Sequence, residues 1–376
     1  MSRTRAAALS LLVVGFGGAA GLCGEEPWTL GPFVKDDAAN PILAAAAEGS
    51  FTCPIRRAPV RWEELAIYNP AAVVREGQVF LLYRAQDKDG TSRLGIATSK
   101  DGVRFKRRPR PVLYPDDDGR KGDEWPGGCE DPRLVEDARG RYVLTYTAYD
   151  GRKARLAVAT SKDLVTWTKH GLAFGEKHRD LWSKSGAIVC RWKGDRCVAE
   201  RVAGRYWMFW GDTSIFAATS DDLVGWTPIL GEDGRPVSVV APRPGRFDSE
   251  LVEPGPPAFL TTAGIVLLYN GRNASDGSGD PRLTQGAYAA GQVLLDAKDP
   301  RRVLARTDAS FLQPDLGHEK SGQVPNVVFV EGLVPFAGRW QLYYGTADSR
   351  LAVASAPLSP RPKRPGPGTS GRPAVP

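Results

Sequence analysis

A repeated segment of about twelve residues constrains the fold of this chain more than any other feature. It reads LGIATSKDGVRF at 94–105, LAVATSKDLVTW at 156–167 and IFAATSDDLVGW at 215–226. The offsets between Ala97, Ala159 and Ala218 are 62 and 59 residues, and a weaker copy, LAVASAPL, stands at 351–358. A nearly constant period of this kind indicates one supersecondary unit that is repeated along the chain.

Each copy follows an apolar or aromatic run that begins after a turn glycine. The runs are REGQVFLLYRAQD (75–87), ARGRYVLTYTAYD (138–150), VAGRYWMFWGDTS (202–214) and FAGRWQLYYGTAD (336–348), and a fifth, TAGIVLLYNGRN, stands at 262–273. Such units are small antiparallel sheets that cannot bury their faces alone but can bury each other when arranged radially. The sequence therefore predicts an all-β fold, a five-bladed β-propeller.

The two ends of the chain differ in composition from the rest. Residues 1–22 have a short basic start, an apolar run and then small residues, a pattern typical of a secretory signal peptide. We therefore expect export, an N-terminal extension over 23–55, a propeller domain over 56–357, and a disordered Pro/Gly-rich tail over 358–376. Cys23 stands where a lipoprotein cysteine would stand, but Leu22 precedes it in place of a small residue, so lipidation is not favoured.

The formal net charge of +7 is concentrated at the ends, since residues 1–22 and 357–376 carry six basic residues and no acidic ones. The body of the chain is therefore close to neutral, and we expect no nucleic-acid partner, because such a partner requires a basic patch on the fold. No segment after residue 22 is apolar enough to span a membrane. The three histidines are scattered and no CxxC occurs, so neither a metal nor a cofactor is expected.

Export would allow disulfides. Cys190 and Cys197 flank RWKGDR, which reads as a hairpin turn, so a bridge between them is geometrically reasonable. Cys53 and Cys129 could pair or remain free, and the sequence leaves this open.

The segment GGCEDPR at 127–133 concentrates charge beside a predicted strand. Pro132 biases Asp131 toward an extended backbone. Arg133 could pair with one carboxylate while the neighbouring carboxylate of Glu130 raises the pKa of the other, which is how a general acid is made. A charged surface turn is the alternative, because Asp-Pro often marks turns.

Polar residues at the ends of inner propeller strands would converge on one mouth, where acids, arginines and aromatic rings suit a carbohydrate. Several longer stretches then resemble glycoside hydrolase family 130. They are GGCEDPRLV (127–135), NPAAVV (69–74), SRLGIATSKDG (92–102), FDSELVEPGPP (247–257), EKSGQVPNVVFVEGLV (319–334) and LYYGTADSRLAVA (342–354). The resemblance covers roughly residues 30 to 357.

This resemblance implies a five-bladed propeller that cleaves β-mannosidic bonds by phosphorolysis or hydrolysis. It implies that Asp131 is the general acid, oriented by Arg133. Phosphorolytic members bind phosphate with basic residues, which here match Arg93 and Lys184. They also carry a His-Arg pair where this chain has Trp210 and Gly211.

The missing pair favours an exported inverting hydrolase of β-mannosidic oligosaccharides. Glu253 and Asp212 are the candidates for activating water, with Glu250 in reserve. The alternatives are a phosphorylase that also binds inorganic phosphate and a non-catalytic sugar-binding propeller. The residues expected to line the sugar subsites are Asn69, Arg84, Arg93, Glu130, Arg133, Lys184, Glu250 and Asp348.

Overall fold

A computed structural model describes residues 28–358. The proposed signal peptide, Cys23 and residues 359–376 of the tail lie outside the described residues. The described chain is almost entirely β, which confirms the predicted all-β class. Its helical segments are α1 (Lys121–Glu124), a 3-10 turn (Glu176–His178) and α2 (Gly317–Lys320). In residues 28–358 there is no helix with the length and apolar character needed to cross a membrane.

The strands form successive antiparallel meanders. The first contains β5 (Ala66–Arg75), β6 (Gln78–Gln86), β7 (Ser92–Ser99) and β8 (Lys106–Arg107). The next contains β9 (Gly128–Glu136), β10 (Tyr142–Tyr149), β11 (Ala154–Ser161) and β12 (Trp167–Leu172). It is followed by β13 (Ala187–Ile188), β16 (Tyr206–Trp210) and β17 (Ile215–Ser220), with β18 (Thr227–Pro228) and β19 (Ser238–Val240) both paired to β17.

The C-terminal half continues the pattern. One meander contains β20 (Leu251–Pro254), β22 (Ile265–Arg272), β23 (Tyr288–Leu295) and β24 (Val303–Arg306), with β21 (Phe259–Leu260) also on β22. The last contains β25 (Val328–Phe336), β26 (Arg339–Thr346) and β27 (Arg350–Pro357). Its outer edge is completed from the other end of the chain by β1 (Val34–Lys35) and β2 (Leu43–Ala44), which both pair with β27.

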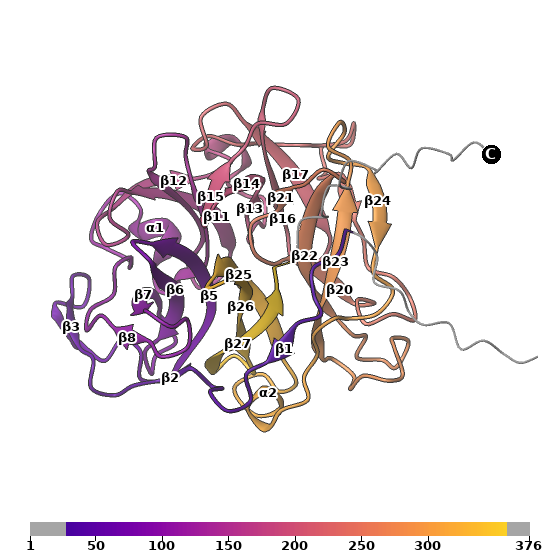
Figure 1. Cartoon of the computed structure of the whole chain (residues 1–376). Helices are drawn as coiled ribbons and strands as arrows, with labels where there is room; N and C mark the ends of the chain where they lie inside the picture. Colours follow the sequence, from indigo (N-terminus) through magenta and orange to yellow (C-terminus); the bar gives the residue numbers. More distant parts are fainter. Residues whose placement is uncertain (1–27, 359–376) are drawn as a thin grey trace, which may run out of the picture.

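Strands of neighbouring meanders contact one another around the whole series. β5 contacts both β9 and β25, β9 contacts β13, β16 contacts β20, and β25 contacts β22 and β23. Figure 1 shows the yellow β25–β27 beside the purple β5. The last meander therefore packs against the first, and the inner strands face a common centre.

The same residues recur in each copy of the sequence repeat because they form local hydrogen bonds. In each copy the serine hydroxyl accepts from backbone amides two and three residues later, and the aspartate two residues on accepts from its own following amides. These residues are Ser99 with Asp101, Ser161 with Asp163, and Ser220 with Asp222. Hydrogen bonds from backbone amides lower the pKa of Asp101 and of Asp163 to about 2. The repeat is therefore a turn that closes each outer hairpin.

A second repeat becomes visible only in three dimensions. In four meanders the second strand carries a buried tyrosine whose hydroxyl donates to a buried carboxylate, and a cation neutralises that carboxylate. The sets are Tyr83–Glu63–Arg107, Tyr146–Glu124–Lys169, Tyr269–Asp248–Arg306 and Tyr344–Glu319–Lys35. These buried acids join segments of the fold, so burial of a carboxylate does not by itself mark the site.

The cysteines separate into a bridge and two free thiols. Cys190 and Cys197 form a disulfide across the hairpin of β14 (Cys190–Lys193) and β15 (Arg196–Ala199), which confirms the predicted pair. Cys53, in β3 (Phe51–Cys53) beside β4 (Ala58–Val60), and Cys129, in β9, are both buried and form no disulfide within residues 28–358.

Candidate active site

A polar residue followed by proline or glycine recurs where each meander begins. The pairs are Asn69-Pro70, Asp131-Pro132, Ser185-Gly186, Glu253-Pro254 and Glu331-Gly332. β-bulges interrupt the ladders at the first, second and last of these, because an extra residue stands opposite the partner strand. Positive φ angles of 52°, 46° and 61° mark Asn69, Asp131 and Ser185. Such backbone irregularity re-aims a side chain out of the strand's alternation, and it clusters at functional sites.

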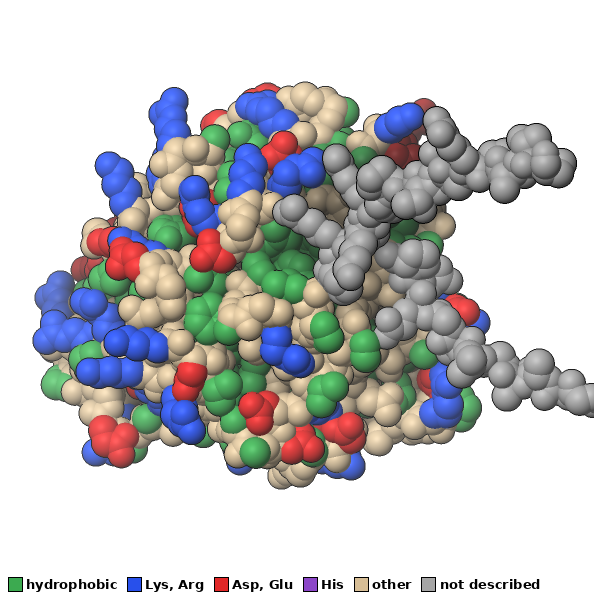
Figure 2. Space-filling view, in the orientation of Figure 1, with side chains coloured by type: hydrophobic (Ala, Val, Ile, Leu, Met, Phe, Trp, Pro, Cys, Tyr) green, Lys and Arg blue, Asp and Glu red, His purple; other side chains and the backbone are tan. Residues whose placement is uncertain are grey.

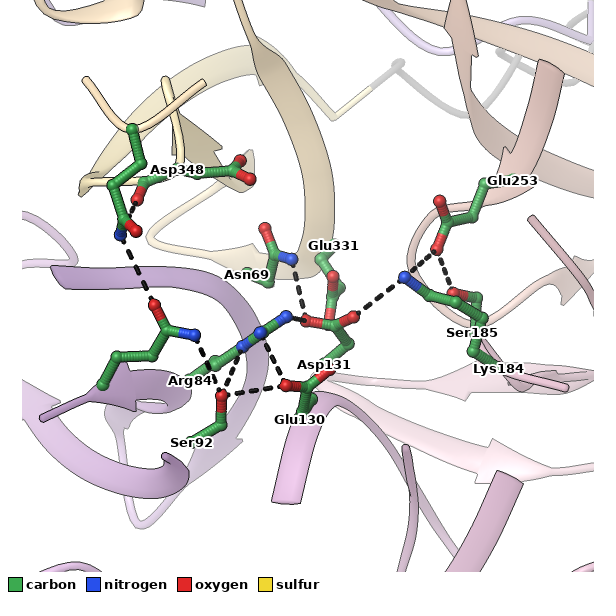
Figure 3. Close-up of polar contacts among 12 residues, drawn as sticks. Asn69, Arg84, Ser92, Glu130, Asp131, Lys184, Ser185, Glu253, Glu331 and Asp348 are labelled. Atoms are coloured by element: carbon green, nitrogen blue, oxygen red, sulfur yellow. Dashed lines mark hydrogen bonds and ion pairs between the residues drawn. The ribbon is translucent and has the colours of Figure 1, made fainter. Parts of the chain in front are cut away.

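Asp131 is held at the centre of the resulting cluster by two donors from the first meander and by an ammonium group from the segment that precedes the third (Figure 3). Its Oδ1 accepts from Asn69 Nδ2 at 2.9 Å and from Arg84 Nη1 at 3.1 Å. Its Oδ2 lies 3.2 Å from Lys184 Nζ. Burial alone would raise the pKa of this carboxyl, but Lys184, Arg84 and the Asn69 amide outweigh burial and hold the pKa well below its usual range. Asp131 is therefore ionised in the free protein.

Glu130, the neighbouring carboxylate, shares Arg84 with Asp131. Arg84 Nη2 lies 2.6 Å from Glu130 Oε1, and the Ser92 hydroxyl donates to the same oxygen at 2.9 Å. The guanidinium also lies over the Tyr68 ring, 4.7 Å from its centroid. Burial raises the pKa of Glu130 despite the opposing charge of Arg84. The pKa of Glu130 is raised and that of the adjacent Asp131 is lowered, so the two buried carboxyl groups can share one proton, which resides on Glu130.

Glu253 faces Asp131 across Lys184. Its Oε1 lies 3.3 Å from Lys184 Nζ and also accepts from the Ser185 hydroxyl. Both acidic oxygens thus contact one ammonium group, at 3.2 and 3.3 Å, so they are at most about 6.5 Å apart. That is at or below the lower limit of the separation of about 6.5–9.5 Å between the carboxyl groups of inverting glycosidases, so an attacking water would need Lys184 to move from between them. Burial raises the pKa of Glu253, and Lys184 opposes that rise.

Glu331 belongs to the cluster, although the sequence analysis did not select it as a site residue. It is fully buried, and its Oε1 lies 3.4 Å from Arg133 Nη1. Neither of its oxygens has a hydrogen-bond partner among the residues that the structure describes. Burial raises the pKa of this carboxyl well above its usual value. Aligning Glu331-Gly332 with Asp131-Pro132 in the repeat is the one sequence observation that could have identified it.

Arg133 acts differently from the expectation that it orients the Asp131 carboxylate. Its three guanidinium nitrogens donate to backbone carbonyls, at 3.1 Å to Asp131, 2.7 Å to Pro254 and 3.0 Å to Gly255. The buried guanidinium therefore fixes the backbone of the Asp131 strand to that of the Glu253 strand. It positions two acids through their backbones and, among the described residues, donates no hydrogen bond to the carboxylate of Asp131 or of Glu253.

Asp348 and Asp212 lie at the margin of the cluster. Burial raises the pKa of the half-buried Asp348 to about 6, although Arg84 opposes the rise. Asp212 Oδ2 accepts from the Trp182 indole at 2.9 Å. Its charge raises the pKa of both Lys184 and Glu253, which places Asp212 beside them.

The structure does not bring Arg93 and Glu250 into contact with these residues. Arg93 follows Ser92 on β7 and so points to the opposite face of the strand, where it is buried and pairs with Asp87 at 2.9 Å. Glu250 is partly exposed and pairs with Arg272 at 2.6 Å. Alternation along a strand, which the sequence analysis did not apply to Arg93, explains its departure from the cluster.

The position of the missing His-Arg pair is filled by core residues. Trp210 is fully buried and packs against Phe174 and Phe216, with ring centroids 4.9 and 5.0 Å apart. Gly211 has a φ of 117°, and a Cβ there would lie 2.3 Å from the Ser214 carbonyl oxygen. No cation can be presented to the site from these two residues.

Paired carboxylates, an arginine and a lysine gathered in one cluster are the groups with which carbohydrate-cleaving enzymes act. Comparison with known protein families identifies which of these enzymes the chain resembles. Residues 40–360 match the glycoside hydrolase family 130 model, described as beta-1,4-mannooligosaccharide phosphorylase, and the chain belongs to this family. Residues 28–358 contain no group of three or more His, Cys, Asp or Glu side chains placed to hold a metal ion.

Individual relatives include both activities of the family. The chain is 34% identical over 309 residues to a 1,2-beta-oligomannan phosphorylase of Thermoanaerobacter, covering 79% of this chain and 92% of the relative. A putative glycoside hydrolase of Bacteroides ovatus superimposes with a TM-score of 0.85 at 48% identity, covering 88% of this chain and 98% of that one. A structure of glycoside hydrolases that target β-1,2 mannosidic linkages in Candida mannan superimposes with a TM-score of 0.85 at 47% identity, covering 88% and 95%.

Proposed function

We propose that this enzyme is an inverting hydrolase of β-mannosidic oligosaccharides, and that β-1,2 linkages are its substrates. One observation carries the choice of water over phosphate. The two cations that reach Asp131, Arg84 and Lys184, are already each shared between two carboxylates. A phosphate dianion would have to displace these acids, because Trp210 and Gly211 supply no donor. The similarity to hydrolases of β-1,2 linkages supports the linkage.

We also propose that the meanders are the blades of a five-bladed propeller. The contacts between strands of successive meanders, and the packing of β25 against β5, support this arrangement. The five polar residues before proline or glycine would then stand at equivalent places around one channel.

In this mechanism Glu253 acts as the base. It takes a proton from a water molecule while the water oxygen attacks the anomeric carbon, and the bond from that carbon to the leaving oxygen breaks. The raised pKa of Glu253 brings its basicity closer to neutral pH, where a general base is most effective. Asp212, beside Lys184, is the second candidate for this role.

Asp131 is the proposed acid, as in the family, and its ionisation in the free protein adds a requirement. The proton given to the leaving oxygen must reach Asp131 after substrate binds. Glu130 is adjacent, has a raised pKa and shares Arg84 with it, so it is our proposed proton source. Sugar hydroxyls that compete for Arg84 would weaken the interaction that keeps Asp131 ionised.

Phosphorolysis is the second candidate, because curated relatives at 34% and 30% identity are phosphorylases. The deciding experiment incubates purified protein with β-1,2-mannobiose in phosphate-free buffer and in phosphate. Release of mannose at equal rates in both buffers, with the α anomer appearing first by NMR, would support hydrolysis with inversion. Mannose 1-phosphate, with no cleavage in the absence of phosphate, would establish the phosphorylase. Binding without cleavage in either buffer would identify a sugar-binding module.

Export is a further proposal, supported by the composition of residues 1–22. Fractionation of cells that produce the full chain tests it. We expect a shortened protein outside the cytoplasm, and an unprocessed cytoplasmic protein would refute export.

A further inference from the structure

Trp182 has an unusual exposure for its type. Among the exposed large hydrophobic side chains of residues 28–358 it is the one aromatic side chain, with 46% of its surface accessible. The preceding Leu181 packs against the hydrophobic core, whereas Trp182 does not. A single exposed apolar side chain is common, but a ring of this size offers a large apolar surface whose burial by a ligand would be favourable.

The indole is fixed in orientation at the edge of the acid cluster. Its Nε1 donates to Asp212 Oδ2 at 2.9 Å. Asp212 in turn lies close enough to Lys184 and Glu253 to raise the pKa of each. The Gly211 amide donates to the Lys184 carbonyl at 2.9 Å, so the segments that carry Trp182 and Asp212 are tied together directly. Trp182 is therefore anchored beside the cluster by a polar edge and leaves its ring accessible.

We propose that Trp182 is the platform of an outer sugar subsite, on which the apolar C–H face of a pyranose unit stacks. The identity of that sugar rests on the proposed function; the existence of the platform does not. An aromatic ring that is already oriented loses little conformational entropy on binding. Trp182 would thus give the enzyme a preference for substrates longer than two units, which the experiment below measures.

The test measures binding by calorimetry in a Glu253→Gln background, which prevents turnover. We expect Trp182→Ala to weaken binding of β-1,2-mannotriose by about three- to tenfold, in the range of aromatic stacking energies, and binding of β-1,2-mannobiose by less than about twofold. Trp182→Phe should retain most of the trisaccharide affinity. Equal weakening for both sugars, or unchanged trisaccharide binding, would overturn the platform.

A matched control is Tyr206→Ala, which removes a partly exposed ring at the opposite end of β16 from Gly211. It should alter neither affinity. In the active enzyme, Trp182→Ala should raise KM for the trisaccharide and leave kcat unchanged. If the wild type bound the trisaccharide without cleaving it, the proposed function would fail while the affinity difference still tested Trp182. If the protein with Trp182 intact bound the trisaccharide and the disaccharide equally well, the sugar platform would be refuted.

Discussion

Lys184 Nζ lies 3.2 Å from Asp131 Oδ2, and this oxygen has no hydrogen-bond partner among the described residues. Of the charges that lower the pKa of Asp131, this ammonium group has the largest effect. It joins the second meander to the segment that precedes the third. The ionisation state of the proposed acid is therefore set by a residue 53 positions later in the chain.

Replacing Lys184 should change both activity and its pH dependence. Lys184→Met removes the cation from between Asp131 and Glu253, so the pKa of both carboxyl groups should rise. We expect kcat/KM to fall by about 10²-fold and the ascending limb of its pH profile to move to higher pH. Initial rates across pH measure this. Lys162→Met, at an exposed lysine, is the control, and a profile that kept its ascending limb would contradict the role.

Asp131→Asn keeps the shape of the side chain and removes its proton chemistry. Loss of a general acid typically costs about 10²–10⁴-fold in rate, and we expect kcat to fall by that amount while mannobiose still binds. Asp195→Asn, in the exposed turn between β14 and β15, should be neutral. Undiminished kcat in Asp131→Asn would remove Asp131 from the mechanism and leave Glu130 as the candidate acid.

Because of Asp348, the folded state should lose stability as the pH rises through the weakly acidic range. Its pKa is raised from 3.8 to about 6, so between these values the native state binds more protons than the unfolded state, and the free energy of unfolding falls with increasing pH. Asp348→Asn should remove this loss, on the order of 1 kcal/mol, at pH 7 and change little at pH 4. Urea unfolding at both pH values measures it; the same difference at both would exclude the shift.

Glu331 should tolerate an uncharged replacement. Its buried carboxyl has a strongly raised pKa, so the neutral form predominates over a wider pH range and ionising it costs stability as pH rises. Glu331→Gln should therefore match the wild type in acid and become relatively more stable at alkaline pH. Thermal unfolding at several pH values tests this, with the exposed Glu232→Gln as control. A variant that became less stable than the wild type as pH rose would show instead that Arg133 needs an ionised Glu331.

The Cys190–Cys197 bridge should stabilise the fold without serving catalysis. It closes a short hairpin, and chain-entropy arguments give about 2 kcal/mol for a loop of this size. Cys190→Ala with Cys197→Ala should lower the free energy of unfolding by that amount and leave kcat/KM unchanged. Urea unfolding with and without reductant checks it. A reductant effect that persists in the double variant, or a loss of activity, would contradict this assignment.

The sequence by itself determined the β class, the repeat and most of the acids that the structure gathers into one cluster. The ATSKD turns are set by hydrogen bonds between residues two or three apart, so they can be read directly from the order of residues. The same holds for the Cys190–Cys197 hairpin. It does not hold for the backbone of Asp131: Pro132 predicts an extended conformation, but Asp131 has a φ of 46° because it stands in a β-bulge.

Only the tertiary structure decided which polar side chains meet. Arg93 adjoins Ser92 in sequence, yet strand alternation sends it to a buried pair with Asp87. Glu331 lies 200 residues from Asp131, yet both stand at bulges on strands that face one centre. Arg133 binds carbonyls that lie more than 120 residues away along the chain. Composition and spacing carry no information on such contacts. The packing of the sheets on one another determines which face a charged side chain lies on and which partner it meets.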